Sequence, residues 1–295
     1  MTVTYNARPE NPTLIDNVVS RAEFRHQRYV IRTSRSGWMW ILLAVLLLAP
    51  GLITALILIG FALTGTDPAD FFITPGAGDF SLLDTLASLG SVSLFTMNIA
   101  LYMVVMLITL GLAANSVNRE KVKRTWEVLL LTNVNARHLV WGKWWASIRA
   151  LWGDHTMLGI LRLGLVATLI AQQADSLPAG PFGLAPGITH MLILGAFVMA
   201  FTALDASITV AMGVAAPLST LPGIVTGAII ISIRLLGMLL NGAYAILVVL
   251  LVIYGQPYEY LIAVAVGLLI GLLLNYAAMR ISENVAVRGQ VSPVD

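Results

Sequence analysis

Residues 119–143 read REKVKRTWEVLLLTNVNARHLVWGK and stand between two long apolar stretches. This segment holds six of the chain's 17 Lys and Arg residues, yet it also contains Trp126, three consecutive leucines and Trp141. A connection that merely joined two helices would need only a few polar residues. A segment of this length can fold back and offer a surface, and its bases decide on which side of a membrane that surface lies.

The composition of the whole chain indicates whether the surface of the folded protein faces water or lipid. Of its 295 residues, 58% are hydrophobic and 11% are charged, whereas about 25% are charged in soluble domains. A soluble protein of this length would still expose roughly a quarter of its surface to water. So much apolar surface must therefore face lipid. The chain has no cysteine, which excludes disulfides, thiol catalysis and Cys-ligated metals.

Six runs are long enough to cross about 30 Å of hydrocarbon, which takes roughly 20 residues. Their length and lack of strict alternation predict an all-α integral membrane protein with six transmembrane helices. The six-span domain covers 38–282, with spans at about 38–63, 86–114, 139–171, 187–213, 223–254 and 258–279. Gly153 is predicted to kink or break the third span. Two separate passes at this point are disfavoured, because they would place the basic C-terminal tail on the outer side of the membrane.

The basic residues predict the orientation of the chain. They precede the first span, follow the second and follow the sixth, whereas the connections 64–85 and 172–186 carry aspartate and no base. By the positive-inside rule, both termini are cytoplasmic in a bacterial-type plasma membrane. Segment 1–37 is predicted to form an interfacial helix with its arginines toward anionic headgroups, or else a plain basic tail that only sets topology. Segment 283–295 is predicted to be a cytoplasmic tail.

Segment 119–137 is predicted to contain a short cytoplasmic amphipathic helix between the second and third spans. Thr125 is a suitable N-cap, and Glu127 would lie in the first turn, where a negative charge suits the helix dipole. Four residues are spaced to form one apolar face: Val122, Trp126, Leu129 and Leu130. That face either lies on the inner leaflet or is held by a cytosolic partner, and the residues alone do not decide between the two.

This region resembles the integral-membrane subunits of ABC-2 type transporters. These subunits have six spans, an N-terminal interfacial helix and a cytoplasmic coupling helix after the second span. The matching residues are Glu120-Lys121, Thr125-Trp126-Glu127, Leu129-Leu130, Thr132 and Gly142-Lys143. Two residues depart from the family pattern: Arg124 stands at the usual Gly position and Asn133 at the usual Pro position. Both positions bear on how the helix fits against its partner.

The resemblance implies a permease subunit of an exporter, whose substrate the sequence does not specify. It implies a second permease chain and a separate cytosolic ATPase that carries ATP and Mg²⁺. The residues implied to couple to this ATPase are Glu120, Thr125, Trp126, Glu127, Leu129 and Leu130. ATP hydrolysis is not expected in this chain, because Gly142-Lys143 lacks the rest of the phosphate-loop motif. A catalytic, cofactor or metal site is not expected either, because no nucleophile pattern, carboxylate pair or metal-ligand spacing stands out in the sequence. The alternative is a permease-like scaffold that does not transport, within a respiratory, photosynthetic or assembly complex.

Four charged residues are predicted to lie inside the membrane. They are Asp154 and Arg162 on the third span, Asp205 on the fourth and Arg234 on the fifth. Such charges are costly in hydrocarbon and usually face one another or a water-filled cavity. Counting along the spans places Arg234 at a depth where it can pair with either Asp154 or Asp205. The pair either holds the bundle together or lines a substrate route or conformational latch. The basic loops are explained by topology, so no nucleic-acid partner is expected.

Overall fold

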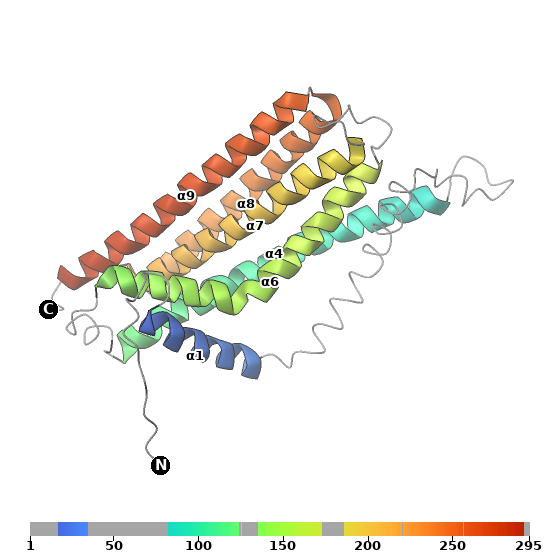
Figure 1. Ribbon diagram of the computed structural model, residues 1–295. Helices are drawn as coiled ribbons and strands as arrows, with labels where there is room; N and C mark the ends of the chain where they lie inside the picture. The colour runs from blue at the N-terminus through green and yellow to red at the C-terminus, as the bar shows by residue number, and fades with distance from the viewer. Residues whose placement is uncertain are drawn as a thin grey trace, which may run out of the picture.

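The computed structural model describes residues 17–34, 82–123, 125, 135–172, 186–219, 221–255 and 257–291. Within these ranges every regular element is helical, which confirms the predicted all-α class for this part of the chain (Figure 1). In chain order the elements are α1 (Val18–Ser34), α4 (Leu82–Val122), α6 (Ala136–Gln172), α7 (Pro186–Ala215), the short 3-10 turn η2 (Ala216–Leu218), α8 (Gly223–Tyr254) and α9 (Pro257–Val291).

Five of the described helices are long and apolar enough to cross a membrane. Their candidate spans are Val92–Val122, Ala136–Ile170, Ile188–Leu218, Gly223–Tyr254 and Tyr258–Val287. The first predicted span, 38–63, lies outside the described residues. The structure therefore supports a multi-pass membrane protein and describes five of the six predicted spans.

The long helices lie side by side, and α1 lies at one end of the bundle beside the first part of α6 (Figure 1). We call this the α1 end; it also holds the last turns of α4, the first turns of α8 and the last turns of α9. Helices α6 and α7 are central, because α6 packs against α1, α4 and α7, and α7 packs against α4 and α9. Helix α8 contacts mainly α9, so most of its apolar side chains stay on the surface.

Three helices differ from the sequence-based expectation, one by an unbroken course and two by a later end. Helix α6 continues through Gly153 without a break, although Figure 1 shows that it bends along its length. Helix α4 continues past the predicted end at Ala114 to Val122, and α9 runs to Val291 through most of the predicted tail. Both extensions are stabilised by tertiary packing, since Val117 of α4 and Ala286 of α9 are fully buried in the core at the α1 end.

Small residues on α9 permit close contact with its neighbours. A Cβ atom added at Gly267 would lie 2.6 Å from the Tyr244 ring, and one at Gly271 would lie 3.0 Å from Leu204 Cδ1. The Tyr244 hydroxyl also donates a hydrogen bond to the Ala263 carbonyl oxygen. Small residues on one helix let an adjacent helix approach closely in a membrane, so Gly267 brings α9 close to α8 and Gly271 brings it close to α7.

Candidate functional site: two buried charge clusters

The buried face of α1 is polar. Asn17, Ser20, Glu23 and Gln27 are all buried, whereas Val18 is 81% exposed. The sequence predicted an interfacial helix here; of its apolar residues, Val18 and Tyr29 are exposed, whereas Val19 packs against the core at the α1 end. The sequence did not predict that the polar side packs against α6. The available signal was Glu23, which is the only acidic residue in α1.

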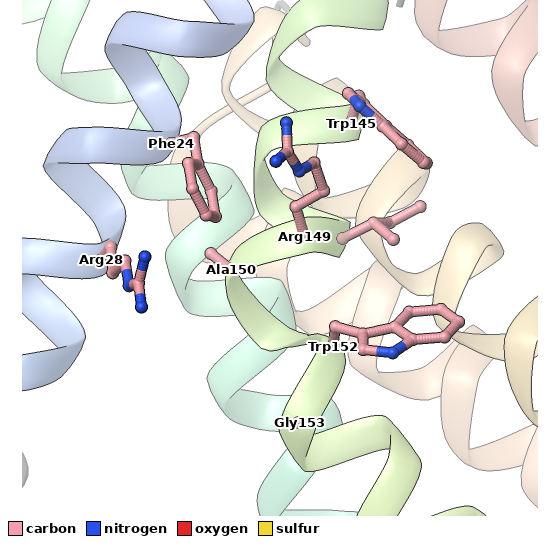
Figure 2. A pocket seen from close by; sticks show the side chains of 8 residues that line it. Phe24, Arg28, Trp145, Arg149, Ala150, Trp152 and Gly153 are labelled. Carbon is pink, nitrogen blue, oxygen red and sulfur yellow. The ribbon is translucent and has the colours of Figure 1, made fainter.

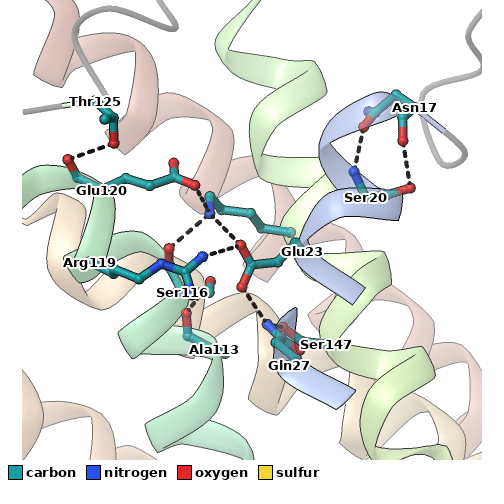
Figure 3. A network of polar contacts seen from close by, with 11 residues as sticks. Asn17, Ser20, Glu23, Gln27, Ala113, Ser116, Arg119, Glu120, Thr125 and Ser147 are labelled. Carbon is teal, nitrogen blue, oxygen red and sulfur yellow. Dashed lines mark hydrogen bonds and ion pairs between the residues drawn. The ribbon is translucent and has the colours of Figure 1, made fainter. Parts of the chain in front are cut away.

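Lys143, on α6, is the centre of the first charge cluster. Its side chain is fully buried, and its ammonium group donates three hydrogen bonds (Figure 3). The acceptors are Glu120 Oε1 at 2.7 Å, the Ser116 carbonyl oxygen at 2.8 Å and Glu23 Oε2 at 3.2 Å. An ammonium group has three donors, so each N–H of Lys143 has a partner.

Glu23 completes this cluster by joining α1 to α4. Arg119 Nη2 lies 2.9 Å from Glu23 Oε2, and Gln27 Nε2 donates to Glu23 Oε1 at 3.2 Å and to Ser147 Oγ at 2.9 Å. We call Glu23, Arg119, Glu120 and Lys143 the α1-end cluster. It contains two carboxylates and two cations. A buried ion pair offsets its desolvation cost best when charge is matched and hydrogen bonds are complete. In this cluster the charges match and Lys143 uses all three donors, whereas Glu120 Oε2 is buried without a hydrogen-bond partner among the described residues.

Gly142 allows α1 to approach α6 closely enough for this cluster to form. A Cβ atom at this position would lie 2.8 Å from Asn17 Oδ1. Asn17 is the N-cap of α1, because its Oδ1 accepts from the Ser20 backbone N–H at 2.8 Å. Its Nδ2 donates to the His138 carbonyl oxygen at 3.0 Å. The Gly142-Lys143 pair therefore forms the docking site for α1.

Helix α9 holds the first turns of α6 from another side. Glu283 Oε1 accepts from Trp141 Nε1 at 2.5 Å and from Arg137 Nε at 3.1 Å. Its Oε2 accepts from Arg280 on the same helix at 3.2 Å. The start of α6, which directly follows the predicted coupling segment, is thus fastened to both α1 and α9.

The predicted coupling residues fall in two groups. Glu120 and Thr125 are described, and Thr125 Oγ1 donates to the Glu120 carbonyl oxygen at 3.3 Å. The other four lie outside the described residues: Trp126, Glu127, Leu129 and Leu130. The carboxylate of Glu120 was expected to face a partner, but in the structure it pairs with Lys143 inside the chain. The base of the segment is therefore anchored in the α1-end cluster.

The second cluster lies midway along the spans and is centred on Arg234 of α8. Arg234 Nη2 donates to Asp205 Oδ1 at 2.5 Å and to the Tyr102 hydroxyl oxygen at 2.7 Å. The Tyr102 hydroxyl donates to Asp205 Oδ1 at 3.4 Å. The sequence left Asp154 and Asp205 as possible partners of Arg234, and in the structure Arg234 pairs with Asp205. Tyr102 was missed, because a single tyrosine in an apolar helix carries no distinguishing pattern.

Arg162 of α6 adds a second cation to this intramembrane cluster. Its Nη1 donates to Thr202 Oγ1 at 2.9 Å, its Nε donates to Asn98 Oδ1 at 3.4 Å, and its Cζ lies 5.3 Å from the centroid of the Tyr102 ring. Among the described residues, no carboxylate lies within ion-pair distance of Arg162. Asp154, also predicted to lie inside the membrane, is half-buried on α6.

The intramembrane cluster therefore joins four helices with unequal charge. Tyr102 comes from α4, Arg162 from α6, Asp205 from α7 and Arg234 from α8. The cluster has two guanidinium groups and one carboxylate: Asp205 pairs with Arg234, and the charge of Arg162 is accommodated by neutral acceptors and by the Tyr102 ring. In the described part of the chain, no group of three or more His, Asp or Glu residues is arranged to hold a metal ion. The arrangement can link helix positions and attract an anion, but it contains no nucleophile activated by a base.

The comparisons with known proteins do not add a family or a fold relative. The resemblance of residues 119–143 to ABC-2 type permeases thus rests on the residues quoted above, and the functional conclusion rests on the two clusters. No protein-family model, no curated protein and no solved structure matches this chain.

Proposed function

We propose that this chain is a permease subunit of an ABC-2 type transporter, driven by a separate cytosolic ATPase through segment 119–137. The α1 end is the cytoplasmic side, both termini lie there, and a second permease chain completes the pathway. The observation that carries the proposal is that both ends of segment 119–137 are anchored in ion pairs, which are largely buried at the first end and half-exposed at Arg137. Arg119 and Glu120 hold one end, and Arg137 holds the other.

This anchoring suits a segment that transmits force. A partner that moves the segment would move the last turn of α4 and the first turns of α6 together, because Lys143 binds Glu120 at 2.7 Å. The same displacement would reach α1 through Glu23 and α9 through Glu283. A connection that lay passively on lipid would gain nothing from such attachments at both ends.

The intramembrane cluster is the element that such a displacement would act upon. Four helices meet at Tyr102, Arg162, Asp205 and Arg234, and their polar contacts hold only for one relative position of those helices. ATP-driven closure of the partner would supply the binding free energy that favours a second arrangement. In that role the cluster is a conformational latch between two states of the pathway.

Affinity purification of the tagged full chain from native membranes tests the proposal. We expect an ATP-binding-cassette ATPase to co-purify, and Trp126→Asp and Glu127→Lys to lose this ATPase while the chain still inserts and remains folded. Asn118→Lys is the matched control, because Asn118 is an exposed residue of α4 just before the segment. This control should retain the ATPase.

Two results would contradict the proposal. One is unchanged ATPase recovery and ATP-dependent transport in both segment variants. The other is recovery of a stable electron-transfer or assembly complex with no ATPase, which would favour the scaffold alternative.

A further inference from the structure

A cavity of about 580 Å³ opens between α1 and the middle of α6 (Figure 2). Its lining combines two arginines with aromatic and aliphatic side chains. The lining residues that matter here are Phe24, Arg28, Trp145, Ile148, Arg149 and Trp152. None of them belongs to either charge cluster, so the cavity is a separate feature of the α1–α6 interface.

The two arginines converge on one aromatic ring. The Cζ atom of Arg149 lies 4.7 Å from the centroid of Phe24, and that of Arg28 lies 5.9 Å from it. Among the described residues, no carboxylate forms an ion pair with either guanidinium. Both guanidinium groups lie against the same ring, which stands between them in Figure 2, and an anion beside that ring could accept charge-assisted hydrogen bonds from them. The cavity is therefore electrostatically suited to a phosphate or carboxylate.

The candidate span of α6, Ala136–Ile170, is longer than a bilayer core requires, so its first part can lie at the level of the headgroups. About 20 residues cross a bilayer core, so the last part of α6, roughly 153–172, is long enough to do so. Arg149 and Trp152 lie just before that stretch, and Trp152 is 59% exposed. Tryptophan and arginine side chains are both favoured at the level of the headgroups, because their apolar parts can contact hydrocarbon while their polar ends contact water and headgroups.

We propose that this cavity binds an anionic glycerophospholipid. Its phosphodiester group accepts hydrogen bonds from Arg28 and Arg149 beside the Phe24 ring, its glycerol region contacts Trp145 and Ile148, and its acyl chain follows Trp152 toward the hydrocarbon. A lipid fits better than a free phosphate because most of the lining beyond the two arginines is apolar or aromatic. The bound lipid bridges α1 and α6 and so strengthens the docking already made by Gly142 and Lys143. This inference requires a membrane location but not an ATPase.

Quenching of tryptophan fluorescence by brominated lipid tests the site, because Trp145 and Trp152 line it. The purified full chain is placed in nanodiscs of phosphatidylcholine and titrated with dibrominated phosphatidylglycerol or dibrominated phosphatidylcholine that has the same acyl chains. We expect phosphatidylglycerol to quench at the lower mole fraction. Trp152→Phe should remove most of this difference between the headgroups. Soluble glycerol 3-phosphate should not reverse the quenching.

Variants of the two arginines locate the effect. The double variant Arg28→Gln/Arg149→Gln should weaken the apparent affinity for brominated phosphatidylglycerol at least about tenfold, because both charge-assisted contacts are lost. Arg25→Gln is the matched control, because Arg25 is an exposed arginine of α1 that does not line the cavity. This control should bind as the unaltered chain does.

Three outcomes would overturn the proposal. They are equal quenching by the two headgroups in the unaltered chain, unchanged affinity in the double variant, and full reversal by glycerol 3-phosphate, which would identify a site for free anions. If the double variant does not fold, the headgroup comparison on the unaltered chain decides the question by itself.

Discussion

The α1-end cluster and the intramembrane cluster both bury arginine or lysine with carboxylates, but they differ in charge balance and depth. The first has two carboxylates for two cations, and it joins the ends of helices. The second has one carboxylate for two guanidinium groups, and it lies about ten residues inside α7 and α8. A balanced cluster near helix ends holds those ends together, here those of α1, α4 and α6. In the unbalanced cluster at mid-membrane depth, Arg162 is held only by neutral groups among the described residues, so it can exchange them for other neutral groups while the Arg234–Asp205 pair stays intact.

This contrast has a clear energetic basis. Water and headgroups can reach a helix end, so a broken contact there can be partly replaced. Deep in the span the only substitutes are other protein groups, and an unpaired charge costs far more. Stability measurements on single variants should therefore rank the two clusters by depth.

Asp205→Asn should have the largest effect. It removes the only carboxylate that pairs with Arg234 in the described chain, and it leaves two guanidinium groups beside each other. Removal of one partner from a buried ion pair typically costs about 3–5 kcal/mol, and we expect the upper part of that range. Thermal unfolding of the purified chain in detergent measures the loss.

A double-mutant cycle shows whether this loss comes from the pair. Arg234→Leu alone should also destabilise the chain, and Arg234→Leu/Asp205→Leu should recover part of the loss because no charge is left unpaired. The same cycle with Asp154 should be additive. Additivity with Asp205, or rescue by Asp154, would contradict the pairing.

Lys143→Met should have the second-largest effect. The substitution leaves Glu23 and Glu120 close together without their shared cation, although Arg119 still pairs with Glu23. We expect a loss of about 3 kcal/mol, at the lower end for a broken buried pair, because the cluster lies near helix ends. The exposed Lys121 provides a matched control, and Lys121→Met should change the unfolding temperature very little. Equal losses in the two lysine variants would show that the α1-end cluster does not hold these helix ends together.

Gly142→Ala should have a smaller effect that is confined to α1. The added methyl group would lie 2.8 Å from Asn17 Oδ1 and displace the N-cap of that helix. Loss of an N-cap costs about 1 kcal/mol. Hydrogen exchange should therefore quicken in α1 before it quickens in α6. Gly153→Ala is the matched control on the same helix, because no atom lies within 4 Å of a Cβ there. Faster exchange in α1 for both variants would contradict the docking role of Gly142.

Arg280→Ala should have the smallest effect. Its partner Glu283 keeps the hydrogen bonds from Trp141 and Arg137, and the Arg280 side chain is half exposed. Exposed pairs of this kind contribute below about 1 kcal/mol. A thermal unfolding curve close to that of the unaltered chain is expected. A loss as large as that of Lys143→Met would show that α9, rather than α1, is the main attachment of the first turns of α6.

Each of the five predicted spans in the described residues lies within or coincides with one long helix, because a long apolar run has one low-energy conformation in lipid. The predicted run 223–254 coincides with α8, and the predicted run 187–213 lies within α7. The depth of Asp205 and Arg234 was predictable for the same reason, since a helix converts residue number into distance. The choice of Asp205 over Asp154 was not predictable, because it depends on how each helix is rotated about its axis.

The burial of the polar face of α1 is a second feature that could not be predicted from the sequence. Glu23 and Lys143 are separated by about 120 residues, and each appears in the sequence as an ordinary charge near a membrane surface. Their burial depends on Gly142, which removes the side chain that would keep the two helices apart.

The sequence by itself thus determined the helical class, the membrane as solvent, the positions of the described spans and the charges that lie within them. These properties follow from composition and local periodicity, which the chain carries in each segment. Only the tertiary structure decided which charges pair, which face of α1 is buried and where Arg28 and Arg149 converge. Those features depend on the rotation and close approach of helices that are distant in the chain, and no local pattern encodes them.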